Sequence, residues 1–546
     1  MRKGIYPLFA AICAAVFVFS SGGDAQTAPA KLTAAQWQAD VRFLGDELPK
    51  RHRNAFHRVK KEDFDATVKA IYDAVPSMTE DEIVVGLMKI VAKVRDGHTN
   101  VIARPYFRSG VYPIGFYLFN DGLYVRKAAA NYSDMLGGKV LRIGKMSAAD
   151  ALVALGKVSF ADNEMGVNQF APLLMSVPEV LAGLKIIEEK QKLDVVVEKD
   201  GKQRSFTVAP TGSFEMLLHG LPEAVDAAAK TTQSPLYLRD PRNLYWYEYI
   251  KDQKIVYVKH NEIGNKPDEP VDAFYRRVFE FVDANPVDKF VLDLRNNGGG
   301  NNGLNIPVVV GLIRSKINRR GKLFVITGRE TFSAAQNLVN QVEKYTEAIF
   351  VGEPTAGHPN HYGDNRPFTL PNSGLTVRAS TLWWQDLDPR DAREWTAPEI
   401  AAELSFSDYK AGRDPALQAV IDYVPGSTLS ELIQNAASQT TLADFTAKYR
   451  SVKSDPKSKY VNSEAAMNRF GYTLLGSKRV ADAIEVFKLN AEAYPRSANV
   501  HDSLGDAYEA AGQKDEAIKS FERALAIDPA FPSSLAAVQR LKGKQP

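Results

Sequence analysis

The spacing of hydrophobic positions changes several times along the chain, and each spacing predicts a different kind of element. Over residues 34–95 apolar side chains recur every three or four positions, as on one face of an α-helix. From Tyr112 to about Thr211 short runs alternate between apolar and polar residues, which predicts β-strands separated by turns. Helical spacing returns after residue 462. The pattern therefore predicts a helical beginning, a β-rich region and a helical end.

Two local signals refine the first half of this prediction. Ser77 with Glu80 three positions later has the form of a capping box, so a helix is expected to start there and to end near Gly97. Residues 192–208 read as a β-hairpin with its turn at 199–202.

Residues 241–425 show a third pattern, in which apolar runs favourable to strands alternate with helical segments. This order is typical of α/β architecture with a largely parallel sheet. The expected strands include 246–249, 255–258, 290–294, 323–327 and 349–351, and the expected helices include 272–281 and 336–344.

The tail contains a repeat of 34 residues, the period of the tetratricopeptide repeat. It predicts two helix-turn-helix units and a capping helix over 533–541, joined to the rest by a linker, 426–461, most flexible at 454–458. Two repeats are marginal alone, so they are expected to pack on the core or on a partner. The positions that repeat are Gly471 with Gly505, Ala483 with Ala517, Phe487 with Phe521, and Pro495 with Pro529.

The front of the chain and its composition bear on location. Arg2 and Lys3 precede an apolar run to Phe19 and small residues up to Ala25, which predicts a signal peptide over 1–25, although an uncleaved anchor has the same outline. The single cysteine, Cys13, lies inside that run. A net charge of +3 over 546 residues gives no indication of a nucleic-acid partner. The expected location is the bacterial periplasm or the outside of the cell, with no stable membrane insertion after signal cleavage.

Two strand-to-loop transitions carry the candidate chemistry. The strand at 290–294 runs into a glycine-rich loop over 295–303, and the strand at 323–327 leads to Ser333 at the start of a helix. A serine beside two sources of backbone N–H offers a nucleophile and an oxyanion hole for acyl transfer. A plain turn with Ser333 as an N-cap is the simpler alternative. Phosphate-binding and GxSxG motifs are absent from the sequence.

Three motifs in this order, Asp293-Leu294-Arg295-Asn296-Asn297-Gly298-Gly299-Gly300, Thr331-Phe332-Ser333-Ala334-Ala335 and Val351-Gly352-Glu353-Pro354-Thr355, resemble the core of the S41 serine peptidases, the family of the tail-specific processing proteases and the tricorn core. The resemblance implies an α/β (α+β) multidomain protein with a ClpP/crotonase-like core and a degenerate PDZ-like region. The domains expected are 1–25 signal peptide, 26–104 helical, 105–211 β-rich and PDZ-like, 212–425 catalytic core, 426–461 linker and 462–546 tetratricopeptide repeats.

The same resemblance implies roles for individual residues. Ser333 corresponds to the nucleophile, and Ala334 with Gly298 or Gly299 would supply the oxyanion hole. Where processing proteases have a lysine base this chain has His358, whereas His98, in Asp96-Gly97-His98-Thr99, matches the Asp-x-His-Thr element of tricorn-like members. We prefer His98 as general base, with His358 as second base, orienting residue or substrate contact.

Other histidines and the overall function complete the expectations. His52 and His57 are interpreted as structural or substrate-facing. His358, His361 and Asp364 make only a weak metal signal, so no metal or cofactor is expected. The leading hypothesis is a secreted or periplasmic endopeptidase that acts on polypeptides, with a possible protein partner at the repeats. The alternatives are a non-catalytic binding protein on the same fold and a scaffold built on the repeats.

Overall fold

The computed structural model describes residues 31–214, 225–228, 234–439 and 441–543, so the predicted signal peptide lies outside the described residues. The chain divides into two compact units. The first extends to Pro398 and includes Ala402–Ile421, and the second comprises Glu399–Ala401 and the chain from Asp422 onward. No helix among the described residues is both long and apolar enough to cross a membrane.

Three helices open the first unit, as the spacing predicts. Thr33 caps α1 in a reciprocal arrangement with Gln36. The prediction that Ser77 caps the third helix is wrong, because Ser77 closes a short 3₁₀ turn with its hydroxyl on the carbonyl of Ala74. Thr79 is the cap instead, paired with Glu82. The helices are α1 (Ala34–Arg51), α2 (Lys61–Ala74) and α3 (Glu80–Ala92).

The next region contains a seven-stranded sheet whose main path runs β2-β3-β4-β6-β7. The predicted hairpin is confirmed, since Lys199 pairs with Lys202 across a turn in which Asp200 and Gly201 both have positive φ. Three helices between β5 and β6 in sequence make this region less purely β than predicted. The elements are β2 (Ile114–Phe119), β3 (Gly122–Ala128), β4 (Lys139–Ile143), β5 (Met146–Ser147), α4 (Ala148–Gly156), α5 (Glu164–Leu174), α6 (Pro178–Gly183), β6 (Leu193–Lys199), β7 (Lys202–Val208) and β8 (Val225–Asp226).

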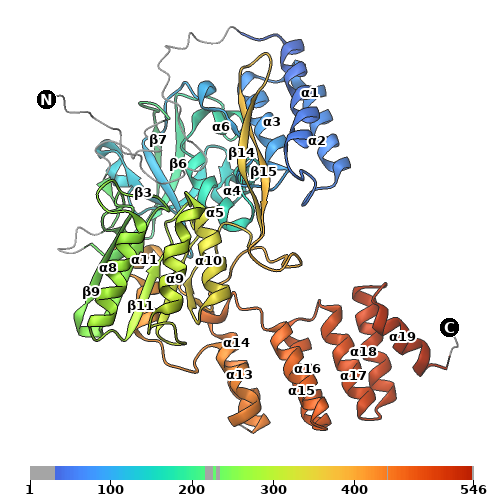
Figure 1. Ribbon diagram of the computed structural model, residues 1–546. Coiled ribbons are helices and arrows are strands. Elements are labelled where there is room, and N and C mark those ends of the chain that lie inside the picture. Colours follow the sequence, from blue (N-terminus) through green and yellow to red (C-terminus); the bar gives the residue numbers. More distant parts are fainter. Residues whose placement is uncertain (1–30, 215–224, 229–233, 440, 544–546) are drawn as a thin grey trace. The chain divides into compact units, whose positions relative to one another are not determined.

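A second sheet forms the centre of the first unit, with strands in the order β13-β12-β11-β10-β9. Strands β10 to β13 are parallel and β9 is antiparallel, so the predicted α/β architecture is confirmed. Their continuous apolar runs suit strands covered on both faces. Figure 1 shows α8, α9 and α10 along this sheet. The elements are β9 (Tyr245–Ile250), β10 (Ile255–His260), α8 (Val271–Ala284), β11 (Lys289–Asp293), α9 (Asn305–Arg314), β12 (Leu323–Thr327), α10 (Ala334–Tyr345) and β13 (Ile349–Gly352).

A small third sheet joins distant parts of the sequence. Strand β1 (Asn100–Ile102) pairs antiparallel with β15 (Thr376–Trp384), which forms a long hairpin with β14 (His361–Thr369), visible as the yellow-orange ribbon in Figure 1. The pairing fixes the end of the N-terminal helical region beside residues that follow the parallel sheet. The first unit ends with α11 (Phe406–Lys410) and α12 (Pro415–Ile421).

The second unit is almost entirely helical. The repeat pattern is confirmed in its packing: a Cβ on Gly471 would lie 2.5 Å from the Phe487 ring, and one on Gly505 2.6 Å from the Phe521 ring, so each small residue makes room for the aromatic of the next helix. The elements are β16 (Ile400–Ala401), α13 (Leu429–Gln439), α14 (Leu442–Ser454), α15 (Glu464–Gly476), α16 (Val480–Ala493), α17 (Ala498–Ala510), α18 (Lys514–Ile527) and the predicted capping helix α19 (Pro532–Leu541).

The prediction of a linker over 426–461 is wrong. Helices α13 and α14 occupy most of it, and their side chains Leu429 and Phe445 are buried in the same apolar cluster as Met467 and Phe487 of the repeats. Helices α13 and α14 therefore add a helical pair to the apolar core of the repeats. Two isolated repeats are only marginally stable, and this pair extends the core that they share.

Candidate active site

Ser333 stands between strand β12 and helix α10 in a strained backbone conformation. Its φ of 55° and ψ of −128° lie in a region that residues with a Cβ rarely adopt. Although it precedes the helix as the N-cap, its side chain makes no capping hydrogen bond. Its Oγ instead lies 2.9 Å from Nε2 of His98. The simpler reading of Ser333 as an ordinary N-cap is therefore wrong.

His98 follows helix α3 and is held between two rings. Its imidazole stacks on Phe332 at a centroid distance of 4.4 Å and on His361 at 5.8 Å. Burial lowers the pKa of His98, and the negative charges of Asp96 and Asp364 oppose that effect. The ring is therefore mostly neutral near neutral pH, the state in which Nε2 can accept a proton.

A second histidine, His52, lies behind this pair. Its Nε2 is 2.9 Å from Oδ2 of Asp96, and both side chains are almost fully buried. Oδ1 of Asp96 accepts the backbone N–H of His98 at 2.9 Å. The sequence offered no signal for this contact, because 44 positions separate the two residues and only the packing of α1 against α3 brings them together.

The glycine-rich loop lies directly against the serine. Gly299 has a φ of 110°, and a Cβ there would lie 2.6 Å from Cβ of Ser333. Its N–H donates to Oδ1 of Asn297 at 2.9 Å. By contrast, the N–H groups of Gly298 and Ala334 have no protein acceptor within the described part of the chain. Of the two glycines expected to supply an oxyanion donor, Gly298 is thus the one whose N–H is unoccupied.

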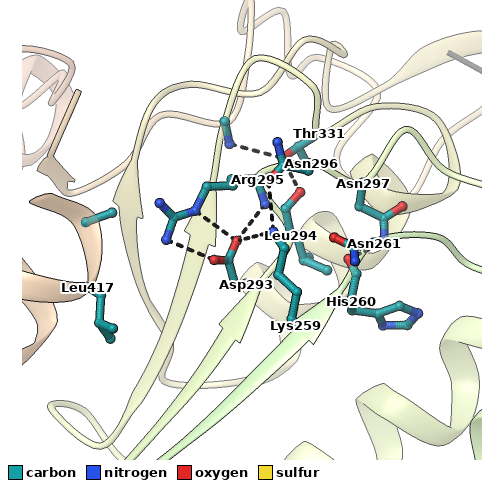
Figure 2. Close-up of polar contacts among 12 residues, drawn as sticks. Lys259, His260, Asn261, Asp293, Leu294, Arg295, Asn296, Asn297, Thr331 and Leu417 are labelled. Carbon is teal, nitrogen blue, oxygen red and sulfur yellow. Dashed lines mark hydrogen bonds and ion pairs between the residues drawn. The ribbon is translucent and has the colours of Figure 1, made fainter. Parts of the chain in front are cut away.

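Buried charges anchor the start of that loop (Figure 2). Oδ1 of Asp293 accepts from Nζ of Lys259 at 3.2 Å, and Arg295 forms an ion pair with Asp293 at 2.9 Å. Arg295 forms a second ion pair with Asp414 at 2.9 Å. Burial raises the pKa of Asp293, but the charges of Arg295 and Lys259 outweigh it and hold the value at about 2. Lys259 also donates to Oδ1 of Asn296 at 2.9 Å. These ion pairs and hydrogen bonds hold the backbone in place at the end of strand β11, where the glycine-rich loop begins.

The loop before Ser333 has its own anchor. Thr331 donates its hydroxyl to the carbonyl of Leu294 at 2.9 Å. Arg329 pairs with Glu353 through two hydrogen bonds of 2.9 and 2.6 Å and donates to the carbonyl of Leu118 in β2. The segment leading to the serine is thus tied to both β11 and the β-rich region.

His358 lies apart from the serine. It lines a polar cavity of about 280 Å³ together with His57, Asp162 and His361. Its backbone N–H donates to Asp162 at 3.3 Å, and its Nδ1 is 3.5 Å from the Arg58 guanidinium. Among the described residues it makes no hydrogen bond to Ser333. The structure brings together Ser333, His98 and the loop, but not His358.

The described residues contain no group of three or more His, Cys, Asp or Glu side chains that could hold a metal ion. The weak signal from His358, His361 and Asp364 is therefore not supported. Asp364 instead lies within strand β14 with a φ of 51°, and its carboxylate accepts Nε1–H of Trp384 at 2.6 Å.

The fold of the chain is similar to that of solved structures of CPAF. Mature CPAF complexed with lactacystin is 12% identical, with a TM-score of 0.50 over 71% of this chain and 99% of that one. A CPAF point mutant is also 12% identical, with a TM-score of 0.50 over 75% and 99%. The photosystem II D1 C-terminal processing protease is 13% identical, with a TM-score of 0.34 over 70% and 96%. The likeness to the two CPAF structures confirms the predicted fold.

The sequence comparisons concern only the second unit. The tetratricopeptide repeat family matches residues 498–531, which are helix α17, helix α18 and their surroundings. The prediction of repeats of this family is confirmed there. No curated protein sequence matches the chain.

Proposed function

We propose that the protein is a serine peptidase of the S41 type, which hydrolyses peptide bonds through an acyl-enzyme on Ser333. The observation that carries the proposal is the distance of 2.9 Å between Oγ of Ser333 and Nε2 of His98. A serine hydroxyl is unreactive without a base within hydrogen-bond reach. The strained backbone of Ser333, which aims its side chain away from the capping position, supports the same role.

In the proposed reaction, Oγ attacks the carbonyl carbon while His98 takes the hydroxyl proton on Nε2. The imidazolium then gives that proton to the leaving amine, and water repeats the sequence to release the acid. The oxyanion would be stabilised by the N–H groups of Ala334 and Gly298. Gly299 is the weaker candidate, because its N–H already donates to Asn297. Its absent side chain is what allows the loop to approach the serine.

His98 is the proposed general base, and His358 has a different role. His358 makes its contacts with Asp162 and Arg58 in the neighbouring cavity. A role in contacting the substrate fits these contacts better than one as second base. Burial lowers the pKa of His98, so its neutral imidazole can accept a proton near neutral pH.

The proposed substrate is an exposed polypeptide segment, with the tetratricopeptide repeats as a docking unit for a protein partner. The sequence pattern over residues 1–25, which predicts a signal peptide, supports the proposal that the protein acts in the periplasm or outside the cell. No nucleic acid and no stable membrane insertion enter this proposal.

The alternative of a non-catalytic protein for apolar ligands has less support. The apolar cavity between Met88, Val101, Phe160 and Phe214 has a volume of about 50 Å³. Pockets for small molecules usually measure about 300–1,000 Å³. This cavity is therefore too small for an apolar ligand of ordinary size without rearrangement.

Labelling of the full chain with a fluorophosphonate tests the proposal. We expect wild type to be labelled, Ser333→Ala and His98→Ala to lose labelling, and His358→Ala to retain it. His501→Ala, in the second unit, is the matched histidine control. Circular dichroism would confirm that each variant is folded. Absence of labelling in folded wild type, together with no hydrolysis of an unfolded protein substrate, would contradict the proposal.

A further inference from the structure

Asp96 is a buried carboxylate at the turn that carries His98. Its Oδ2 accepts from Nε2 of His52 at 2.9 Å and from the hydroxyl of Thr99 at 2.5 Å. Its Oδ1 accepts the backbone N–H of His98 and lies 3.9 Å from Nδ1 of the same residue. The Asp96 side chain is 1% exposed, so little solvent screens its charge.

The tautomer of His52 follows from its second contact. The backbone N–H of Asn54 lies 2.9 Å from Nδ1 of His52. A backbone N–H can only donate, so Nδ1 is the acceptor and the ring proton sits on Nε2, facing Asp96. His52 therefore supplies a hydrogen bond but no positive charge. Burial opposes ionisation of Asp96, but the hydrogen bond from His52 and the charge of a protonated His98 hold the pKa of Asp96 well below its usual range.

We propose that Asp96, backed by His52, is a positioning residue for His98. Its charge keeps the proton of neutral His98 on Nδ1, which leaves Nε2 free to accept the Ser333 proton. It also stabilises the imidazolium that forms when Oγ attacks. The proton moves only between Oγ, Nε2 and the leaving amine, and Asp96 stays ionised throughout. This inference rests on the proposed function of Ser333 and His98.

The other titratable groups that face His98 come from strand β14. Burial and the charge of His98 lower the pKa of His361 to about 4, so it is neutral near pH 7. Asp364 is exposed, and its charge is screened by solvent. The carbonyl of Tyr362 also raises the pKa of His98, but carries no charge. Of the two carboxylates whose charges act on His98, Asp96 is thus the buried one.

The first test is the pH dependence of kcat/KM for Asp96→Asn in the full chain. We expect the plateau to fall by about 10²- to 10⁴-fold. We also expect the acid limb to move to lower pH, because loss of the anion lowers the pKa of His98 further. Asp162→Asn is the matched control, since Asp162 is also buried and accepts the N–H of Gly97 at 2.7 Å. It should leave the acid limb unshifted.

His52 provides a second pair of variants. His52→Phe keeps a ring of similar size but removes the donor to Asp96, so it should lower kcat more than it raises KM. His52→Gln retains an N–H donor and should restore part of the loss. Equal activity of the two variants would overturn the role of His52.

A readout without turnover separates this inference from the proposed function. In ¹⁵N-histidine-labelled protein at pH 7, with the His98 signal assigned by His98→Gln, we expect the Nδ1–H tautomer. Asp96→Asn should shift it toward a mixture. The Nε2–H tautomer in wild type, or an unchanged tautomer and acid limb in Asp96→Asn, would overturn the role of Asp96. If folded wild type shows the expected tautomer but Ser333 neither labels nor turns over, the proposed function fails while the positioning of His98 stands.

Discussion

Gly97 and Phe332 share one space: a Cβ on Gly97 would lie 2.8 Å from Cζ of Phe332. The Phe332 ring stacks on His98, and Ser333 follows Phe332 in the chain. A glycine beside the proposed base thus lets an aromatic ring beside the nucleophile press against the imidazole. The distance between His98 and Ser333 therefore depends on Gly97 having no side chain.

Gly97→Ala is expected to push the Phe332 ring against His98. Overpacking of this kind costs about 1–3 kcal/mol of unfolding free energy, and the fluorophosphonate labelling rate should fall about tenfold or more, since small displacements of reacting groups are costly. Denaturant unfolding and labelling kinetics measure the two effects. Gly476→Ala, where a Cβ would meet nothing within 4 Å, is the control. A labelling rate that stays at the wild-type value would contradict the role of this contact.

Gly299→Ala is expected to abolish labelling of Ser333. The added Cβ would meet Cβ of Ser333 at 2.6 Å in a backbone conformation with φ of 110°. Gly374→Ala separates the two causes, because Gly374 has a φ of 69° but no atom within 4 Å of its added Cβ. Both variants should lose about 1–2 kcal/mol from backbone strain, and only Gly299→Ala should lose labelling. Retained labelling in folded Gly299→Ala would count against contact between loop and nucleophile.

Arg329→Met is expected to lower the free energy of unfolding by about 3–5 kcal/mol, because it leaves the carboxylate of Glu353 buried without its partner. Arg329 and Glu353 are 8% and 12% exposed in their side chains. The double variant Arg329→Met with Glu353→Leu should recover much of that loss. Chemical denaturation of the two single variants and the double variant gives the coupling energy. Strictly additive effects would show that the pair does not act as a unit.

His361 should make the protein less stable as the pH falls from about 6.5 to about 4. Burial lowers its pKa to about 4 from an ordinary value of 6.5, so the unfolded chain binds a proton in this window that the folded chain excludes. The contribution of neutral His361 to the free energy of unfolding is complete above pH 6.5. It is lost as the pH falls to about 4, by about 3 kcal/mol in all. Urea titrations of wild type and His361→Gln at several pH values measure this. Parallel curves for the two proteins would refute it.

Phe487→Ala should destabilise the second unit without removing labelling of Ser333. The ring is fully buried against Gly471, and its loss costs about 3–5 kcal/mol through the cavity it leaves. Leu535→Ala, at a side chain that is 39% exposed, is the control. Limited proteolysis should cut the second unit of Phe487→Ala first. Loss of labelling in a chain whose first unit remains folded would contradict the expectation that labelling of Ser333 does not depend on the second unit.

Local sequence was sufficient for several elements. The alternation over 192–208 with its Asp200-Gly201 turn specified a hairpin, and the 34-residue period specified helix pairs, because each depends on residues close in sequence. The helix cap was missed by two residues. Ser77 and Thr79 both have an acidic residue three positions later, and the geometry of the preceding 3₁₀ turn selected Thr79. The helices α13 and α14 were missed although capping residues mark their starts, Thr428 with Glu431 for α13 and Thr441 with Asp444 for α14.

By itself, the sequence determined the parallel sheet, because hydrophobic period is a property of the chain. Its resemblance to the S41 serine peptidases supplied the glycine loop beside Ser333 and the candidate bases His98 and His358. Only the tertiary structure decided which histidine reaches the serine, because 235 positions separate His98 from Ser333. It alone revealed His52 behind Asp96 and the occupied N–H of Gly299. These contacts depend on how α1, α3, β14 and the loop before α10 pack together, and no local pattern in the sequence encodes distances between them.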